Sequence, residues 1–128
     1  MQVERVDFVA IPTRDRERAV TFYGETLGLL RNEKAHKDFP EFEAGNVTLA
    51  IVAPEEMGMP FATLPPGQIA LRVHDLQAAR AELEAAGVEF TGDTFDSSVC
   101  HMAFFKDPDG NGLMLHHRYA PYSDGTTP

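Results

Sequence analysis

The chain has a single cysteine, Cys100, and no tryptophan among its 128 residues. One cysteine cannot form a disulfide within the chain, and this usage favours a reducing compartment. A chain of this length buries enough surface to fold without disulfides or a structural metal. The sequence therefore predicts one ordinary domain over residues 1–118, held together by an apolar core.

Basic side chains are also few: the chain has 11 Lys and Arg compared with 20 Asp and Glu, which gives a formal net charge of -9. This charge repels phosphate backbones and anionic lipid headgroups. No apolar run approaches the ~20 residues of a membrane-spanning helix, and the first residues lack the basic and apolar regions of a secretion signal. We therefore expect a cytoplasmic protein of bacterial type, with neither nucleic acid nor a membrane as its partner.

Two stretches of the chain, residues 6–30 and 67–90, resemble each other. Each begins with alternating or β-branched apolar residues and continues through an aspartate, a helix-spaced apolar set and a glycine. The matching pairs are Asp15 with Asp75 and Gly28 with Gly87. This pattern predicts a strand, a capped helix and a further strand in each copy.

The second copy carries the clearer signal. Ile69, Leu71 and Val73 alternate with other residues, which is the period of a half-buried strand. The following helix is predicted to bury one face, made of Leu76, Ala79, Leu83 and Ala86. The first copy repeats the pattern with Val9 and Ile11 on the strand and Ala19, Phe22, Tyr23 and Leu27 on the helix.

Further extended segments follow each helix and are joined by turn signals. Gly45 and Asn46 predict a hairpin in the first half, and residues 107–111 (DPDGN) predict a turn in the second. The predicted order is therefore βαβββ twice, an α+β fold. The units are expected at residues 3–53 and 67–118, with a proline-rich linker at 54–66 and a polar tail at 119–128.

Two motifs lie on this framework. The first consists of Asp15, Ala19, Phe22, Tyr23, Leu27 and Gly28, and the second runs from Phe105 to Leu113 as F-x-D-P-D-G-N-x-L. A duplicated βαβββ unit with these motifs resembles the vicinal oxygen chelate superfamily of glyoxalases, bleomycin-resistance proteins and extradiol dioxygenases. The resemblance implies an incompletely closed mixed barrel with helices outside, a concave ligand groove, and a homodimer.

The resemblance also implies four metal-ligand positions, which relatives fill with histidine and glutamate. The matching positions here are Phe8, Ala50 (Thr48 if the register differs), Gln68 and Met114. A phenyl, a methyl and a thioether cannot hold a hard cation, and one neutral amide does not offset its desolvation. We therefore expect no metal and no other cofactor.

Strand alternation predicts which side chains face the groove, because they lie opposite the helix-facing ones. The expected strand at residues 99–105 is apolar at odd and at even positions, so alternation alone does not decide which side chains face the groove. Its spacing to the DPDGN turn, matched to the family pattern, favours Cys100, Met102 and Phe104. The predicted ligand-binding set is Phe8, Glu41, Glu43, Gln68, Arg72, Cys100, Met102, Phe104, Met114 and His116. Polarisable apolar side chains with a few polar groups among them suit a small organic ligand.

Three functions stay open at this point. The first is a metal-free binding protein for a small ligand. The second is an enzyme of the glyoxalase or dioxygenase type, either metal-independent with His116 as the best acid–base candidate, or with a displaced metal held by Cys100, His116 and Glu43. The third is an interaction module with a vestigial site. His36, His74 and His101 are interpreted as surface or helix-side residues without a chemical role.

Overall fold

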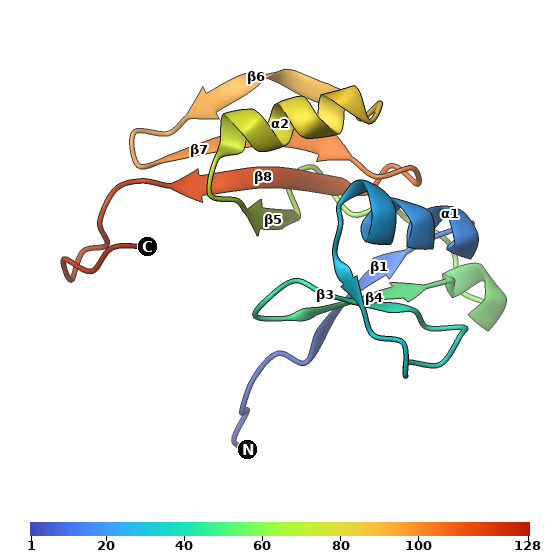
Figure 1. Cartoon of the computed structure of the whole chain (residues 1–128). Helices are drawn as coiled ribbons and strands as arrows, with labels where there is room; N and C mark the ends of the chain where they lie inside the picture. Colours follow the sequence, from blue (N-terminus) through green and yellow to red (C-terminus); the bar gives the residue numbers. More distant parts are fainter. The chain divides into compact units, whose positions relative to one another are not determined.

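The computed structural model describes all 128 residues, which form two compact units, Met1–Leu64 and Pro65–Pro128 (Figure 1). The first unit contains β1 (Phe8–Pro12), α1 (Arg16–Thr21), the π-helical η1 (Phe22–Thr26), β2 (Leu30–Arg31), β3 (Glu41–Glu43), β4 (Thr48–Val52) and the 3-10 helix η2 (Pro54–Met57). The second contains β5 (Ile69–Arg72), α2 (Leu76–Ala85), β6 (Phe90–Asp96), β7 (Cys100–Lys106) and β8 (Gly112–Arg118). No helix has the length and apolarity needed to span a membrane.

Each unit builds one four-stranded mixed sheet. The strand orders are β1-β4-β3-β2 and β5-β8-β7-β6, with β1 parallel to β4, β5 parallel to β8 and the other neighbours antiparallel. Neither sheet closes on itself. The predicted α+β fold with two βαβββ units is confirmed.

The first sheet buries one face. Ile11, Phe42, Leu49 and Ile51 share that face in the strand ladder and are at most 1% exposed. Tyr23 packs there with its ring centroid 6.2 Å from that of Phe42. Successive side chains of a strand point to opposite faces, so burying one face of the sheet requires an apolar residue at every second position. This is the alternation from which the strands were predicted.

The first helix differs from the prediction. A single helix through Leu27 was expected, but the chain widens after Thr21, and the Leu27 N–H donates to the Phe22 carbonyl five residues earlier. The widened turn lets two adjacent rings, Phe22 and Tyr23, both be buried in a T-shaped contact of 5.3 Å. Gly28 then ends the turn with a positive φ of 71°, as predicted.

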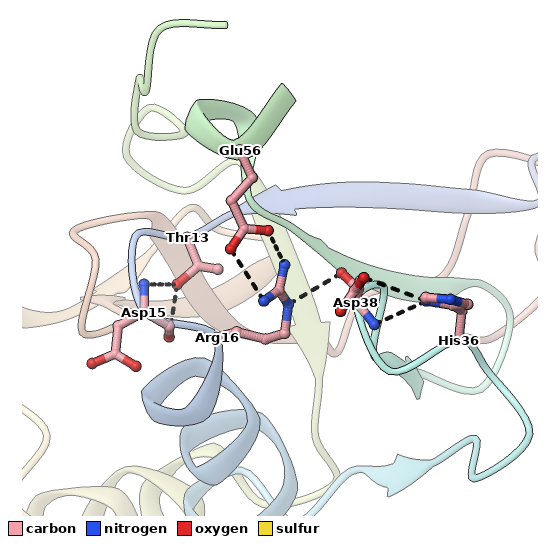
Figure 2. A network of polar contacts seen from close by, with 6 residues as sticks. All are labelled: Thr13, Asp15, Arg16, His36, Asp38 and Glu56. Carbon is pink, nitrogen blue, oxygen red and sulfur yellow. Dashed lines mark hydrogen bonds and ion pairs between the residues drawn. The ribbon is translucent and has the colours of Figure 1, made fainter. Parts of the chain in front are cut away.

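The segment predicted as a linker begins as an ordered part of the first unit. The Arg16 guanidinium donates to both carboxylate oxygens of Glu56 and to the Asp38 carbonyl, and the Asp38 N–H donates to His36 Nδ1 (Figure 2). Arg14 pairs with Glu55 at 3.2 Å. These contacts tie η2 and the loop before β3 to the start of α1.

In the second unit, α2 lies along one face of the sheet (Figure 1) and contacts β7 and β8. Asp75 caps α2 by accepting from the Ala78 N–H at 3.0 Å, and Leu76 and Leu83 are buried. The facing side chains Ala103, Phe105, Leu113 and Leu115 are at most 3% exposed. Ala86, predicted on the buried face, is exposed because α2 ends at Ala85 and the chain turns away at Gly87.

The DPDGN turn is closed by buried hydrogen bonds. The Asp107 carboxylate accepts from the N–H groups of Asp109 and Asn111 at 2.9 Å and from the Asn111 side-chain amide at 2.8 Å. Both Asp107 and Asn111 are buried. This network explains why the turn joining β7 to β8 needs these residue types.

Candidate ligand-binding faces

The face of the second sheet opposite α2 gathers most of the predicted ligand-binding residues. Residues paired across the strands share a face, and the ladder sets Met102 opposite His116, Phe104 opposite Met114, and Arg72 beside His116. The parity prediction for strand seven is therefore confirmed, while the ligand role of these residues stays a prediction.

The apolar members of this face are only half-buried. Met102, Phe104 and Met114 retain partial exposure, and their neighbour Phe95 is 55% exposed. Phe95 pairs with Met102 in the ladder, so it belongs to the same face. It is absent from the predicted set because β6 reaches Asp96 only through an irregular pairing with β7, which local alternation does not reveal.

Gly67 packs directly against this face. A Cβ atom at Gly67 would lie 2.8 Å from Phe104 Cε1 and 2.9 Å from Met114 Cε, so only glycine fits there. A Cβ at Gly112 would likewise lie 2.1 Å from the Pro65 carbonyl oxygen. The segment 65–67 therefore packs against part of the apolar surface formed by Phe104 and Met114.

His116 and Arg72 give this face its polar chemistry. Burial lowers the pKa of His116, and the positive charge of Arg72 lowers that pKa further, with smaller contributions from His117 and Arg118. The imidazole is therefore neutral at neutral pH and can accept a proton or a hydrogen bond.

Cys100 shares this face but is buried. Its Sγ lies 2.9 Å from Ser97 Oγ, and its backbone N–H donates to the same hydroxyl. Gln68 is exposed and lies immediately before β5, not within it as the sequence predicted, because the chain there still belongs to the turn after the two prolines.

In the first unit, two predicted residues line a pocket of about 260 Å³. Phe8, 58% exposed, and Glu41 meet Arg5, Asp7 and Thr48 around it. Sequence reasoning missed Arg5 and Asp7, which precede the strand, although they pair with each other at 3.0 Å.

Both predicted glutamates of this unit have partners. Glu41 accepts from the Asn32 side-chain amide at 3.0 Å, and Glu43 accepts from the Thr48 hydroxyl at 3.0 Å. Glu41 and Glu43 therefore stand on one face of β3, away from the buried Phe42.

The side chains at the family's metal positions do not fit a metal ion. Phe8 pairs with Thr48 in the ladder, and Ala50 lies on the same face of the first sheet. Met114 lies on the open face of the second sheet, and Gln68 precedes β5. Neither unit brings together three His, Cys, Asp or Glu side chains that could hold a metal ion. Cys100 and His116, considered as ligands of a displaced metal, are therefore not part of such a group within the second unit.

Comparisons with known proteins agree with this architecture. A family model described as Glyoxalase/Bleomycin resistance protein/Dioxygenase superfamily matches residues 5–115. The crystal structure of TnmS3, an antibiotic binding protein from Streptomyces sp. CB03234, is 28% identical, with a TM-score of 0.73 over 92% of this chain and 98% of that one. Lactoylglutathione lyase from Agrobacterium tumefaciens has a TM-score of 0.73 over 90% of this chain and 94% of its own, but at 17% identity it shows the fold alone. An uncharacterised protein of Mycolicibacterium smegmatis is 28% identical over 91% of this chain and 96% of its own.

Proposed function

Because the chain belongs to the Glyoxalase/Bleomycin resistance protein/Dioxygenase superfamily, we propose that it binds a small organic ligand on the face of the second sheet opposite α2, without a metal. One observation carries the proposal. Half-buried Met102, Phe104 and Met114 stand beside His116 and Arg72 on one sheet face, where the strand ladder holds them in register.

This composition is that of a ligand surface. Thioethers and a phenyl ring offer polarisable contact area to a flat organic molecule, and covering their exposed parts is favourable by ~25 cal/mol per Å² of apolar surface. A neutral imidazole and a guanidinium at one end supply an acceptor and a donor that fix the ligand's orientation. The 28% identity to an antibiotic binding protein supports the same class of function.

The metal-free character follows from donor chemistry. Side chains without lone pairs, or with a single weak donor, leave the dehydration of a divalent ion uncompensated. Elemental analysis of protein purified without chelators is therefore expected to find no stoichiometric transition metal. One tightly held Zn, Ni, Mn or Fe per chain would overturn this part of the proposal.

Ligand contacts are also proposed on the same face of the first sheet, from Phe8 and Glu41 at the pocket and from Glu43, which accepts from the pocket residue Thr48. Two carboxylates beside an exposed ring suit the protonated nitrogen of an amphipathic compound. Gln68 and Cys100 remain proposed contacts in the second unit. Replacing each residue singly tests its own contribution.

The binding experiment uses two fluorescent aromatic probes of opposite charge, 8-anilinonaphthalene-1-sulfonate and proflavine. Saturable 1:1 binding of at least one probe is expected, with a rise in melting temperature. Phe104→Ala and Met114→Ala should each weaken binding about tenfold, since each removes contact area. Met57→Ala, an exposed methionine on η2, is the matched control and should leave binding unchanged. Absence of binding by both probes and by a broad compound library would overturn the proposal.

A second candidate function is supported by the lowered pKa of His116. A neutral imidazole on a ligand face can act as a general base in a metal-independent isomerase or lyase. Turnover of a 2-oxo compound or its thiol adduct, lost in His116→Gln at an unchanged melting temperature, would support this enzyme over the binding protein.

We propose further that the chain works in the cytoplasm as a homodimer. The single buried cysteine suits a reducing compartment. Light scattering after size-exclusion chromatography measures the mass directly, and a monomeric mass at micromolar concentration would contradict the dimer.

A further inference from the structure

A second cavity lies on the other face of the second sheet, the face that carries α2. It has a volume of about 590 Å³ and is lined by His74, Asp75, Leu76 and Gln77 at the start of α2, Thr94 of β6, His101 of β7 and His117 of β8. Neighbouring residues of a strand point to opposite faces, so His117 faces this cleft while His116 faces the proposed ligand surface. The cleft is therefore separate from that surface.

His117 is held in one tautomer. Its Nδ1 lies 2.9 Å from the Val73 carbonyl oxygen. A carbonyl can only accept a hydrogen bond, so Nδ1 carries the proton and Nε2 of the neutral ring carries a lone pair. The His74 ring stands at 89° to the His117 ring with centroids 6.5 Å apart, which places an aromatic edge against an aromatic face.

His101 lies directly opposite His117 in the ladder. Its Nε2 lies 3.4 Å from a carboxylate oxygen of Asp96. Asp96 is itself fixed by the Tyr119 hydroxyl at 2.8 Å and the Ser98 N–H at 2.9 Å. Because the carboxylate accepts, Nε2 is the protonated nitrogen and Nδ1 of the neutral ring is left as an acceptor.

The charges around the cleft are negative. Asp75 lines it and uses one oxygen to cap α2, and Asp96 stands behind His101. The nearby cation, Arg80, is already engaged by Glu84, the Gly92 carbonyl and the Thr94 hydroxyl. The second unit as a whole has nine acidic and four basic side chains. The side-chain carboxylates and the lone pairs therefore favour a cationic hydrogen-bond donor over an anion.

We propose that this cleft binds a small planar organic cation of the amidine class. Its N–H groups would be donated to His117 Nε2, His101 Nδ1 and the Asp75 carboxylate, and its flat body would rest against the imidazole rings. The volume lies within the ~300–1,000 Å³ of small-molecule sites. A metal ion is not the proposed occupant, because Asp75, His101 and His117 line the cleft without forming a group that could hold one metal ion.

Benzamidine is the probe, and ¹H–¹⁵N correlation spectra of the full chain at pH 8 are the readout. Saturable shifts are expected for the backbone amides of residues 74–77, 94, 101 and 117. Benzamide, neutral and of the same shape, should bind at least tenfold more weakly, and benzoate should produce no shifts. Equal binding of benzoate, or shifts absent from these amides, would overturn the proposal.

Two conservative variants test the acceptors without removing their structural bonds. Asp75→Asn keeps the helix cap and removes the charge, and it should weaken benzamidine binding several-fold. His117→Asn keeps a donor toward the Val73 carbonyl and removes Nε2, and about tenfold weaker binding is expected. Glu89→Gln, an exposed carboxylate of the second unit that does not line the cleft, is the control and should leave the affinity unchanged. Unchanged affinity in both Asp75→Asn and His117→Asn would refute the assignment.

Discussion

The two units follow the same βαβββ plan but differ in what their uncovered faces carry. Where the helix packs on the sheet both are apolar, with Ile11 and Ile51 in the first sheet and Leu71 and Leu115 in the second. The faces that carry no helix differ between the two sheets. The first presents Phe8, Ala10, Ala50, Glu41 and Glu43, and the second presents Arg72, Met102, Phe104, Met114 and His116.

This difference shows which constraint acts on which face. A helix packed on a sheet demands apolar side chains of matching volume in both copies. No such demand acts on the opposite face, which no helix of the same unit covers. This divergence is why the chemistry of the chain has to be derived from individual residues and not from the repeat.

The largest expected difference in stability between the two faces of the second sheet is at two adjacent phenylalanines of β7. Phe105 is 1% exposed and packs against Phe90 at 5.3 Å, whereas Phe104 is half-buried on the opposite face. Phe105→Ala should lower the free energy of unfolding by about 3–5 kcal/mol because it leaves a cavity. Phe104→Ala should cost about 1 kcal/mol, since its ring is less enclosed. Urea denaturation of both variants gives the comparison, and equal losses would mean that the two faces are assigned wrongly.

The two hairpin turns offer a smaller contrast of the same kind. Asn111 is 0% exposed and donates to the Asp107 carboxylate, whereas Asn46 in the turn between β3 and β4 is exposed. Asn111→Ala should lower the free energy of unfolding by about 2 kcal/mol, because it strips a buried carboxylate of a donor. Asn46→Ala should change it by less than ~0.5 kcal/mol. The same urea titration measures both, and a loss of similar size at Asn46 would show that burial is not what separates the turns.

Periodicity predicted what repeats locally. The two helix caps at Asp15 and Asp75, the glycine stops at Gly28 and Gly87 and the βαβββ order of elements along the chain all follow from patterns within one copy. The facing of Met102 and Phe104 could be predicted only by matching the spacing to the DPDGN turn with the family pattern, because the strand is apolar at odd and even positions alike.

Features that depend on distant segments could not be predicted. The need for glycine at positions 67 and 112 comes from close contacts with residues far along the chain. The β6 strand continues beyond its apolar start because β7 pairs with it, which brings Phe95 onto the same face as Met102. His74 and His101 were interpreted as having no chemical role, and only the fold brings them to one cleft with His117.

The smallest predicted effect concerns pH and His116 on the open face of the second sheet. Burial, followed by Arg72, lowers the pKa of His116 below its ordinary value of about 6.5, so the folded state resists protonation more than the unfolded chain does. The unfolded chain then binds more protons as pH falls through about 6.5, and the free energy of unfolding should decline between pH 8 and pH 5.

The variant His116→Gln tests this origin of the pH dependence. Its side chain does not titrate, so its free energy of unfolding should fall less than that of the unaltered chain over the same interval. Asp96 and Asp124 do not confuse the result: hydrogen bonds from Tyr119 and Thr126 lower their pKa values, so their contribution is lost only below about pH 4. Urea unfolding at each pH supplies the two profiles. Parallel profiles would mean that the decline arises elsewhere and that His116 is not the neutral acceptor on which the ligand proposal relies.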